Sequence, residues 1–249
     1  MKSFAIANIK GGCGKTTVAV NLAAGLALSG KRVCLFDLDP QSASTFHLVA
    51  AGANGNLADC LASEKKLPEI LARTLVDGLT VAPGTRLLAP FDNGGHPTRD
   101  RLRQLLGQVP PEVDYVLFDT PPTWGSLLIA SLSCVDAVLI PVATRELDLR
   151  MLQLLQDVID QIRRHRNPSL RIAGILPNRT IRTRLSGRIE GELRTAHGPL
   201  VYPPIRETAR LAEAGGFHAP IQVSSPSSAG AADFEEVTRA FLEREERSF

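Results

Sequence analysis

The sequence predicts an α/β fold in which a doubly wound, mainly parallel sheet carries helices on both faces. Short apolar runs alternate along the chain with segments whose apolar residues recur at helical spacing. The runs are continuously apolar, as expected for strands that helices cover on both sides. The 249 residues are 44% hydrophobic and 22% charged, which is typical of a soluble globular protein. One domain is the simplest arrangement for this length.

The first strand is predicted at residues 4–9, and a helical pattern follows at residues 16–28. Gly30 stands just past that pattern, where a glycine commonly ends a helix. The next strand is expected at residues 32–36. Further strands are predicted at residues 79–82, 115–118, 137–142, 170–176 and 200–202, and the clearest later helices at residues 147–164 and 231–246.

Membrane-spanning and secreted proteins are disfavoured by the composition. Every apolar run is shorter than the ~20 residues that cross a bilayer, and the first run is too short for a secretory signal. The cysteines, Cys13, Cys34, Cys60 and Cys134, have no metal-binding or redox spacing. We therefore expect a cytoplasmic protein with reduced thiols and no membrane partner.

A glycine-rich loop between the first strand and the first helix is the strongest functional signal. Its sequence is Lys10-Gly11-Gly12-Cys13-Gly14-Lys15-Thr16-Thr17. Glycines allow several backbone N–H groups to turn toward one anion, and the helix N-terminus adds the positive end of its dipole. Lys15 can reach the β- and γ-phosphates of a nucleotide, and the Thr16 hydroxyl can ligate Mg²⁺. This segment therefore predicts a phosphate-binding loop.

The loop departs from the usual G-x-x-x-x-G-K-[ST] pattern at two positions. Ile9 stands where the first glycine would fall, and a second lysine, Lys10, precedes the double glycine. This variant resembles the deviant Walker A motif of the ParA/MinD family of P-loop ATPases. The resemblance implies one P-loop ATPase domain over residues 1–249, ATP and Mg²⁺ as cofactors, and an ATP-dependent sandwich homodimer. In such a dimer Lys10 would reach the partner's nucleotide. The nucleotide contacts implied in this loop are Lys10, Gly11, Gly12, Cys13, Gly14, Lys15, Thr16 and Thr17.

Acidic residues follow two of the predicted strands. Asp37 and Asp39 lie two positions apart after residues 32–36, so both can face the phosphate loop. The segment resembles switch I of the family, which implies that Asp39 orients the attacking water and Asp37 lies near the magnesium. Alternatively, Asp39 caps a helix whose first residue is Pro40, and the two roles are compatible. The catalytic residues implied by the resemblance are Lys10, Lys15 and Asp39.

Asp119 ends the run at residues 115–118 and is followed by Thr120-Pro121-Pro122. This pattern looks like the Walker B strand and switch II, where an acidic residue can hold a magnesium-bound water at the sheet edge. The metal-site residues implied are Thr16, Asp37 and Asp119. Trp124, just beyond, is either part of the core or part of a dimer surface.

Asn178 follows the predicted strand at residues 170–176. Its amide has one donor and one acceptor side, which match the N7/N6 edge of adenine. The resemblance implies that the base is held by Asn178 and by backbone near Pro204. The alternative is a turn asparagine following Pro177.

Residues 163–210 form a basic block of eleven arginines, three glutamates and no lysine, a net charge of +8. Segments around Arg182, Arg184 and Arg210 resemble those with which ParA proteins contact DNA, and such contacts would bind phosphates without reading sequence. The alternative is a solvated face on which Arg206 and Arg210 pair with Glu207 and Glu213.

Two further features separate the classes within this family. Residues 233–249 carry six acidic residues and three arginines, unlike the basic amphipathic helix with which MinD-like members bind membranes. Only Cys134 lies near the region of an iron–sulfur ligand, which disfavours the nitrogenase-iron-protein branch. We expect a cytoplasmic, nucleoid-associated ParA-type ATPase that positions cargo, bound to nonspecific DNA and stimulated by a ParB-like partner. The alternatives are a MinD-like membrane ATPase and a metabolic enzyme of the amide ligase or dethiobiotin synthetase type.

Overall fold

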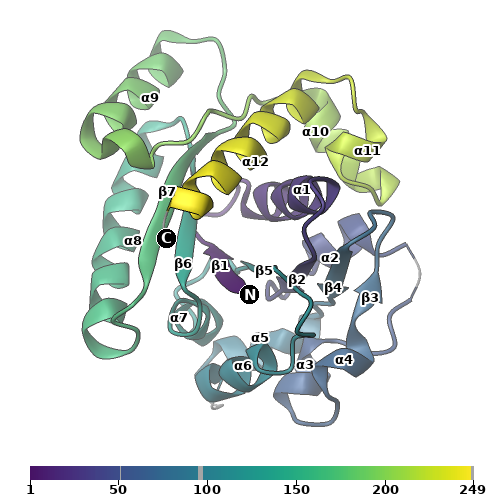
Figure 1. Ribbon diagram of the computed structural model, residues 1–249. Coiled ribbons are helices and arrows are strands. Elements are labelled where there is room, and N and C mark those ends of the chain that lie inside the picture. The colour runs from purple at the N-terminus through teal and green to yellow at the C-terminus, as the bar shows by residue number, and fades with distance from the viewer. Residues whose placement is uncertain (51, 95–97, 248–249) are drawn as a thin grey trace.

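A computed structural model describes residues 1–50, 52–94 and 98–247. Its centre is a seven-stranded sheet of order β3-β4-β2-β5-β1-β6-β7 (Figure 1). The strands are β1 (Lys2–Ile6), β2 (Val33–Asp37), β3 (Ala72–Arg73), β4 (Leu79–Ala82), β5 (Tyr115–Asp119), β6 (Ala137–Ala143) and β7 (Arg171–Asn178). All neighbouring strands pair in parallel except β3, which is antiparallel to β4. The predicted doubly wound, mainly parallel sheet is confirmed.

Helices cover both faces of this sheet (Figure 1). They are α1 (Lys15–Leu28), α2 (Ala43–Leu48), α3 (Leu57–Leu61), α4 (Leu67–Ile70), α5 (Ala89–Asp92), α6 (Thr98–Leu106), α7 (Ser126–Leu132), α8 (Glu146–His165), α9 (Arg184–His197), α10 (Ala209–Glu213), α11 (Ile221–Ser224) and α12 (Ala229–Arg247). Short 3-10 turns are η1 (Arg86–Leu88), η2 (Gly198–Leu200) and η3 (Ala214–Phe217).

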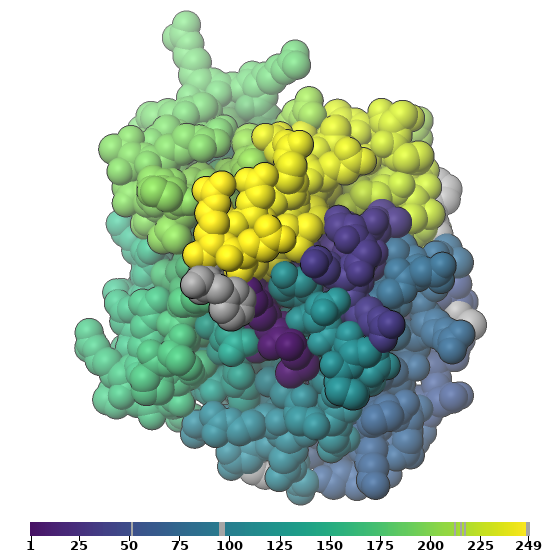
Figure 2. All heavy atoms as spheres, viewed as in Figure 1, coloured from purple at the N-terminus to yellow at the C-terminus, as the bar shows by residue number. Residues whose placement is uncertain are grey.

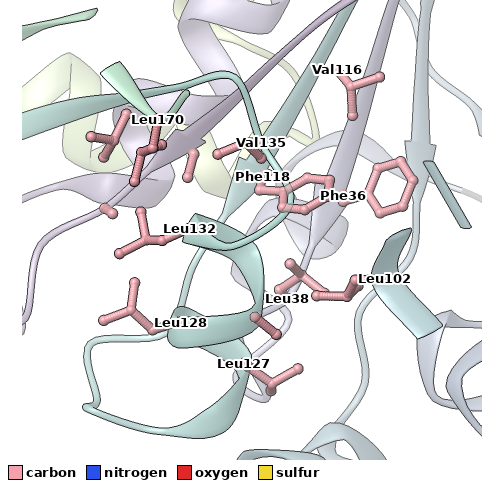
Figure 3. Packing of buried hydrophobic residues seen from close by; sticks show 14 of the residues in the cluster. Phe36, Leu38, Leu102, Val116, Phe118, Leu127, Leu128, Leu132, Val135 and Leu170 are labelled. Carbon is pink, nitrogen blue, oxygen red and sulfur yellow. The ribbon is translucent and has the colours of Figure 1, made fainter. Parts of the chain in front are cut away.

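The core consists of two apolar layers, one on each face of the sheet. Because alternate strand residues point to opposite faces, Phe36 packs with α3, α6 and α7, whereas Leu35 packs with α1 and α12. Figure 3 shows the first layer, where Phe36 and Phe118 lie with their ring centroids 4.9 Å apart. Few aromatics are needed, since leucine, valine, isoleucine and alanine fill most of both layers.

Helix α12 packs on α1, and their contact closes the second layer. Their surfaces adjoin in Figure 2, where α12 is yellow and α1 purple. Phe234, Val237 and Phe241 are fully buried, whereas Leu242 is half-buried. A side chain at Gly25 would lie within 2.2 Å of the Thr238 hydroxyl, so the two helices approach closely only because position 25 is glycine.

Residues 200–202 do not form the predicted strand. They contribute the end of η2 and a single parallel bridge between Val201 and Ile175. Pro203 and Pro204 follow directly, and because proline has no N–H to donate they interrupt the pairing, which resumes at Ile205. The sequence reasoning also missed β3, whose two residues are too few to show a pattern.

Candidate functional site

The glycine-rich loop lies at the carboxyl edge of the sheet, between the end of β1 and the start of α1. Gly12 and Gly14 have φ angles of 76° and 89°, a left-handed conformation that glycine adopts without strain. A Cβ at position 14 would lie 2.2 Å from the Asn178 amide nitrogen, so only glycine fits. No side chain in the described part of the chain caps α1, which leaves its first N–H groups for an anion.

Lys15 is buried beside this loop, with 6% of its surface exposed. Its ammonium donates a hydrogen bond of 3.3 Å to the backbone carbonyl of Lys10. The neighbouring Thr16 side chain lies close enough to Asp119 to lower the pKa of its carboxyl. The structure therefore brings together the lysine and the hydroxyl that the motif assigns to phosphate and magnesium.

Asp37 and Asp119 are register partners at the carboxyl ends of β2 and β5. Thr45 donates to Asp37 through its backbone N–H and its hydroxyl, and Ser44 donates to Asp119 at 2.7 Å. One oxygen of each carboxylate is buried and has no partner among the described residues. Burial raises the pKa of Asp37 to about 7, with a further contribution from the charge of Asp119, and burial raises that of Asp119 to about 6. Two adjacent buried carboxylates with free oxygens form a donor set suited to a hard divalent cation.

Asp39 lies beyond β2 and is 9% exposed. Its carboxylate accepts a hydrogen bond of 2.9 Å from the N–H of Gln41, and its backbone carbonyl accepts one from Ser42. The interpretation of Asp39 as a helix cap with Pro40 at the first position is wrong, because α2 begins at Ala43 and Ser42 occupies the capping position. Asp39 instead closes a turn ahead of the helix.

Lys10 forms an ion pair with Asp148 on α8 of the same chain. The lysine side chain is 22% exposed and the aspartate is fully buried, with its second oxygen unpartnered among the described residues. Sequence reasoning assigned Lys10 to the nucleotide of a partner subunit and did not identify Asp148. No motif marks Asp148, because its contact with Lys10 depends on how α8 packs beside the loop.

Asn178, at the end of β7, is 2% exposed and donates a hydrogen bond of 2.8 Å to the Cys13 carbonyl. It borders a hollow of about 310 Å³, which is also lined by Gly12, Gly14, Thr17, Arg179, Arg206, Glu207, Thr208 and Leu211. Pro204, the other residue expected to hold the base, lines a separate hollow with Arg194 and Arg244, and its contact with the base stays a prediction. Residues 206–208 line the hollow together with Gly12 and Gly14, and a parallel bridge joins Arg206 to Thr180.

Most arginines of the basic block are paired, so it is not the open cationic face that the composition suggests. Arg206 is bound by Asp233 rather than by the expected Glu207, whereas the expected pair of Arg210 with Glu213 is present at 3.2 Å. The other pairs are Arg163 with Asp160, Arg171 with Glu245, Arg179 with Glu207, Arg188 with Glu146 and Glu192, and Arg194 with Glu190.

Among the described residues, Arg182 and Arg184, like Arg164 and Arg166, have no ion pair, unlike the other arginines of the block. Arg182 and Arg184 are both exposed. Ile181 and Leu185 beside them are also exposed, at 51% and 43%. The three arginines expected to contact DNA are therefore Arg182, just before α9, and Arg184, its first residue, both without an ion pair among the described residues, and Arg210, in an exposed pair on α10.

Trp124 is 49% exposed between β5 and α7, so its interpretation as a core residue is wrong. The adjoining loop is anchored through Asp92, whose carboxylate accepts hydrogen bonds from the Thr123 hydroxyl and the Leu127 N–H. A side chain at Gly125 would collide with the same carboxylate. The anchored loop holds the indole at the surface next to the end of β5.

Comparison with known proteins agrees with the site. A family model described as an AAA domain matches residues 1–172. The sporulation initiation inhibitor protein Soj of Bacillus subtilis is 36% identical over 92% of this chain and 94% of its own length. The chain belongs to the ParA/MinD family of P-loop ATPases. Within this family the chromosome-partitioning ATPase Soj of Thermus thermophilus is also 36% identical, over 98% of this chain and 96% of its own.

Solved structures show the same fold. Cobyrinic acid a,c-diamide synthase from Mycobacterium smegmatis, crystallised with an ATP analogue and magnesium, has a TM-score of 0.84 and 26% identity. The similarity covers 100% of this chain and 97% of that chain. Among the described residues of this ParA/MinD-family ATPase, no helix has the length and apolarity needed to span a membrane.

Proposed function

We propose that this chain is a ParA-type ATPase that forms an ATP-dependent sandwich homodimer, binds nonspecific DNA and positions a cargo. A ParB-like partner would stimulate hydrolysis and release the dimer from the nucleoid. Residues 1–249 would act as one domain. The observation that carries the proposal is the second lysine, Lys10, at the mouth of a complete phosphate loop, in a chain 36% identical to two Soj proteins over almost its whole length.

The residues present fit Mg²⁺ and a nucleotide. Buried oxygens of Asp37 and Asp119 without partners among the described residues lie at the ends of adjacent strands, and the Thr16 side chain lies beside Asp119. These groups would hold the cation, directly or through water, beside the phosphates that the loop binds. Bound Mg²⁺ would neutralise charge on the phosphate oxygens.

The remaining roles belong to side chains of the chain itself. Lys15 would neutralise charge on the β- and γ-phosphates from its buried position. Asp39 would orient the attacking water with the carboxylate oxygen that Gln41 does not use. Lys10 would leave Asp148 to reach across a dimer, so pairing of two subunits and rearrangement of this ion pair would be one event. Slow turnover without a partner follows if that rearrangement is unfavourable.

DNA binding would use Arg182 just before α9 and Arg184 at its start, together with Arg210 on α10. Guanidinium groups can bind phosphate oxygens in any sequence context. Arg182 and Arg184 are already free of protein carboxylates among the described residues, whereas Arg210 would exchange Glu213 for a phosphate. A dimer doubles the number of such contacts, which accounts for a dependence of DNA binding on ATP.

A metabolic ligase is the second candidate, because cobyrinic acid a,c-diamide synthase has a closely similar structure. The two candidates differ in what hydrolysis requires. A ligase needs an acid acceptor and an amine donor, whereas a ParA-type ATPase turns over ATP alone and responds to DNA or a partner protein. Lys10 supports the ParA-type activity, because the resemblance assigns such a second lysine in the loop to a contact across the dimer.

The experiment is a comparison of mass and DNA binding with ATP and with ADP. We expect light scattering to show a dimer with ATP and Mg²⁺ in an Asp39→Ala variant that hydrolyses slowly, and a monomer with ADP. Unrelated DNA duplexes of equal length should bind the ATP form with equal affinity. A monomer in both nucleotides, or ATP turnover that requires an added small-molecule acid, would reject the proposal.

A further inference from the structure

Two consecutive residues at the end of β7 hold two consecutive carbonyl groups of the phosphate loop. The amide nitrogen of Asn178 donates to the carbonyl of Cys13 at 2.8 Å. The Nη1 atom of Arg179 donates to the carbonyl of Gly12, also at 2.8 Å. These two carbonyls therefore point toward β7 and away from the inner side of the loop, where the motif places the phosphates.

The planarity of the peptide unit converts these contacts into control over the phosphate-binding N–H groups. In a trans peptide the C=O of one residue and the N–H of the next lie in one plane and point in opposite directions. Holding the Gly12 carbonyl outward therefore turns the N–H of Cys13 inward. In the same way, Asn178 turns the N–H of Gly14 inward through the Cys13 carbonyl.

Arg179 is itself held in place. Its Nε donates to Glu207 at 3.0 Å, and its Nη2 makes a second bond to the same carboxylate. Glu207 is fixed in turn, because its N–H donates at 3.0 Å to the carbonyl of Thr180. Arg179 has a φ of 52°, a left-handed conformation that non-glycine residues keep only where the surroundings hold it. The guanidinium thus bridges two fixed points, the loop carbonyl and Glu207.

We infer that Arg179 is a positioning residue of the phosphate loop and that Glu207 holds it in the required orientation. Asn178 acts on the next peptide in the same way, in addition to bordering the hollow expected to take the base. The ligand that this arrangement serves is the phosphate chain of the nucleotide, not the base. The inference rests on the proposed ATP site.

Competition binding with two ligands separates a phosphate effect from a base effect. A fluorescent ATP analogue bound to the full chain with Mg²⁺ is displaced either by ATP or by inorganic tripolyphosphate, which has no base or sugar. We expect Arg179→Ala to lower the affinity for ATP and the affinity for tripolyphosphate by the same factor, about three- to tenfold. This is the effect expected for loss of one well-oriented hydrogen bond. Arg179→Lys restores only part of the affinity, because an ammonium cannot donate to Gly12 and Glu207 in the same fork geometry.

Two further variants test the bridge. Glu207→Gln removes the charge that holds the guanidinium. We expect a smaller loss of affinity than in Arg179→Ala, again by the same factor for ATP and for tripolyphosphate. The matched control is Arg194→Ala, which removes an exposed arginine paired with Glu190 on α9, away from the loop. We expect both affinities to be unchanged in the control. Circular dichroism and melting curves verify that each variant is folded.

The outcomes distinguish this inference from the proposed function. A loss for ATP without a loss for tripolyphosphate would overturn the inference, because Arg179 would then act on the base or ribose. Unchanged affinities in both Arg179 variants would overturn it as well, because the contacts of Arg179 with Gly12 and Glu207 would then have no effect on phosphate binding. If the unaltered protein bound neither ligand, the proposed ATP site itself would be wrong, and the inference would fall with it.

Discussion

Lys10 on the phosphate loop and Asp148 on α8 are joined by an ion pair in which the aspartate is completely buried. Asp148 has a second oxygen without a partner among the described residues, so Lys10 provides most of the compensation for its charge. A lysine that is to contact a second subunit must give up this partner. If Lys10 contacts a second subunit as proposed, the pair would link the stability of one subunit to the formation of a dimer.

Removing Lys10 is expected to weaken folding and dimerisation for separate reasons. Lys10→Ala leaves Asp148 buried and uncompensated, which we expect to cost ~3 kcal/mol, the lower end for buried pairs because Lys10 is partly exposed. Adding Asp148→Asn removes that charge and should restore much of the melting temperature. Dimerisation with ATP should remain absent in the double variant. A double variant that dimerises normally would contradict a role for Lys10 at the subunit interface.

Asp39→Ala is expected to retain ATP binding while slowing hydrolysis, so the ATP-bound dimer should accumulate. Asp39→Asn is the matched variant, because its amide oxygen can still accept from the N–H of Gln41 and preserve the turn. Both variants should hydrolyse slowly if the negative charge orients the water. Phosphate release measured at saturating ATP tests this. Wild-type turnover in Asp39→Asn would show that only the turn matters.

Asp119→Asn is expected to separate metal binding from folding. Asp37 and Asp119 are buried neighbours, and when both are charged their repulsion destabilises the folded state. Neutralising one of them should therefore raise the melting temperature of the metal-free protein. The increase in ATP affinity caused by Mg²⁺ should be lost. Titrations with Mg²⁺ and with EDTA measure this difference. An unchanged Mg²⁺ effect would place the cation elsewhere.

Trp124 is expected to report on nucleotide binding. It is the only tryptophan of the chain and lies 49% exposed beside the carboxyl end of β5. Addition of ATP and Mg²⁺ should move its emission to shorter wavelength, since a dimer surface would exclude water from the indole. Lys15→Ala, which removes a main compensation of phosphate charge, should show no shift. Identical spectra with and without nucleotide in the unaltered protein would exclude Trp124 from the interface.

The salt dependence of DNA binding tests the arginine assignment. Each phosphate contact should contribute a slope of roughly −0.9 to log affinity against log salt. Arg182→Ala removes one contact per subunit, so the slope for a dimer should flatten by roughly 2 units, equally on unrelated sequences. Arg239→Ala on α12 lies outside the basic block and serves as control. An unchanged slope in Arg182→Ala would leave this arginine as part of a solvated face.

The pattern of apolar runs was sufficient to predict the sheet and its main helices. Strand β4 was predicted with its observed ends, and α1 and α8 each begin one residue before the prediction. Local signals failed in two ways where pairing was minimal. Strand β3 was missed because a two-residue strand has no periodicity to detect, and a strand was wrongly predicted at residues 200–202, where only a single bridge forms.

In the candidate site, too, features formed by neighbouring residues could be predicted, and contacts between distant residues could not. The phosphate loop was visible because glycines, Lys15 and Thr16 are adjacent in the chain, and Asp37 and Asp119 were visible because each ends an apolar run. Partners from distant segments could not be inferred in this way. Asp148, Glu207 and the role of Arg179 depend on contacts between residues 28 to 167 positions apart.

The sequence by itself therefore determined the fold class, the phosphate loop and the acidic strand ends, since each depends on the spacing of residues close together in the chain. The tertiary structure alone decided which charges are compensated: Lys10 by Asp148, Arg206 by Asp233 and Arg179 by Glu207. The reason is physical. Backbone conformation follows from local patterns, whereas the electrostatic free energy of a side chain depends on which distant groups packing places against it and how far it is removed from water.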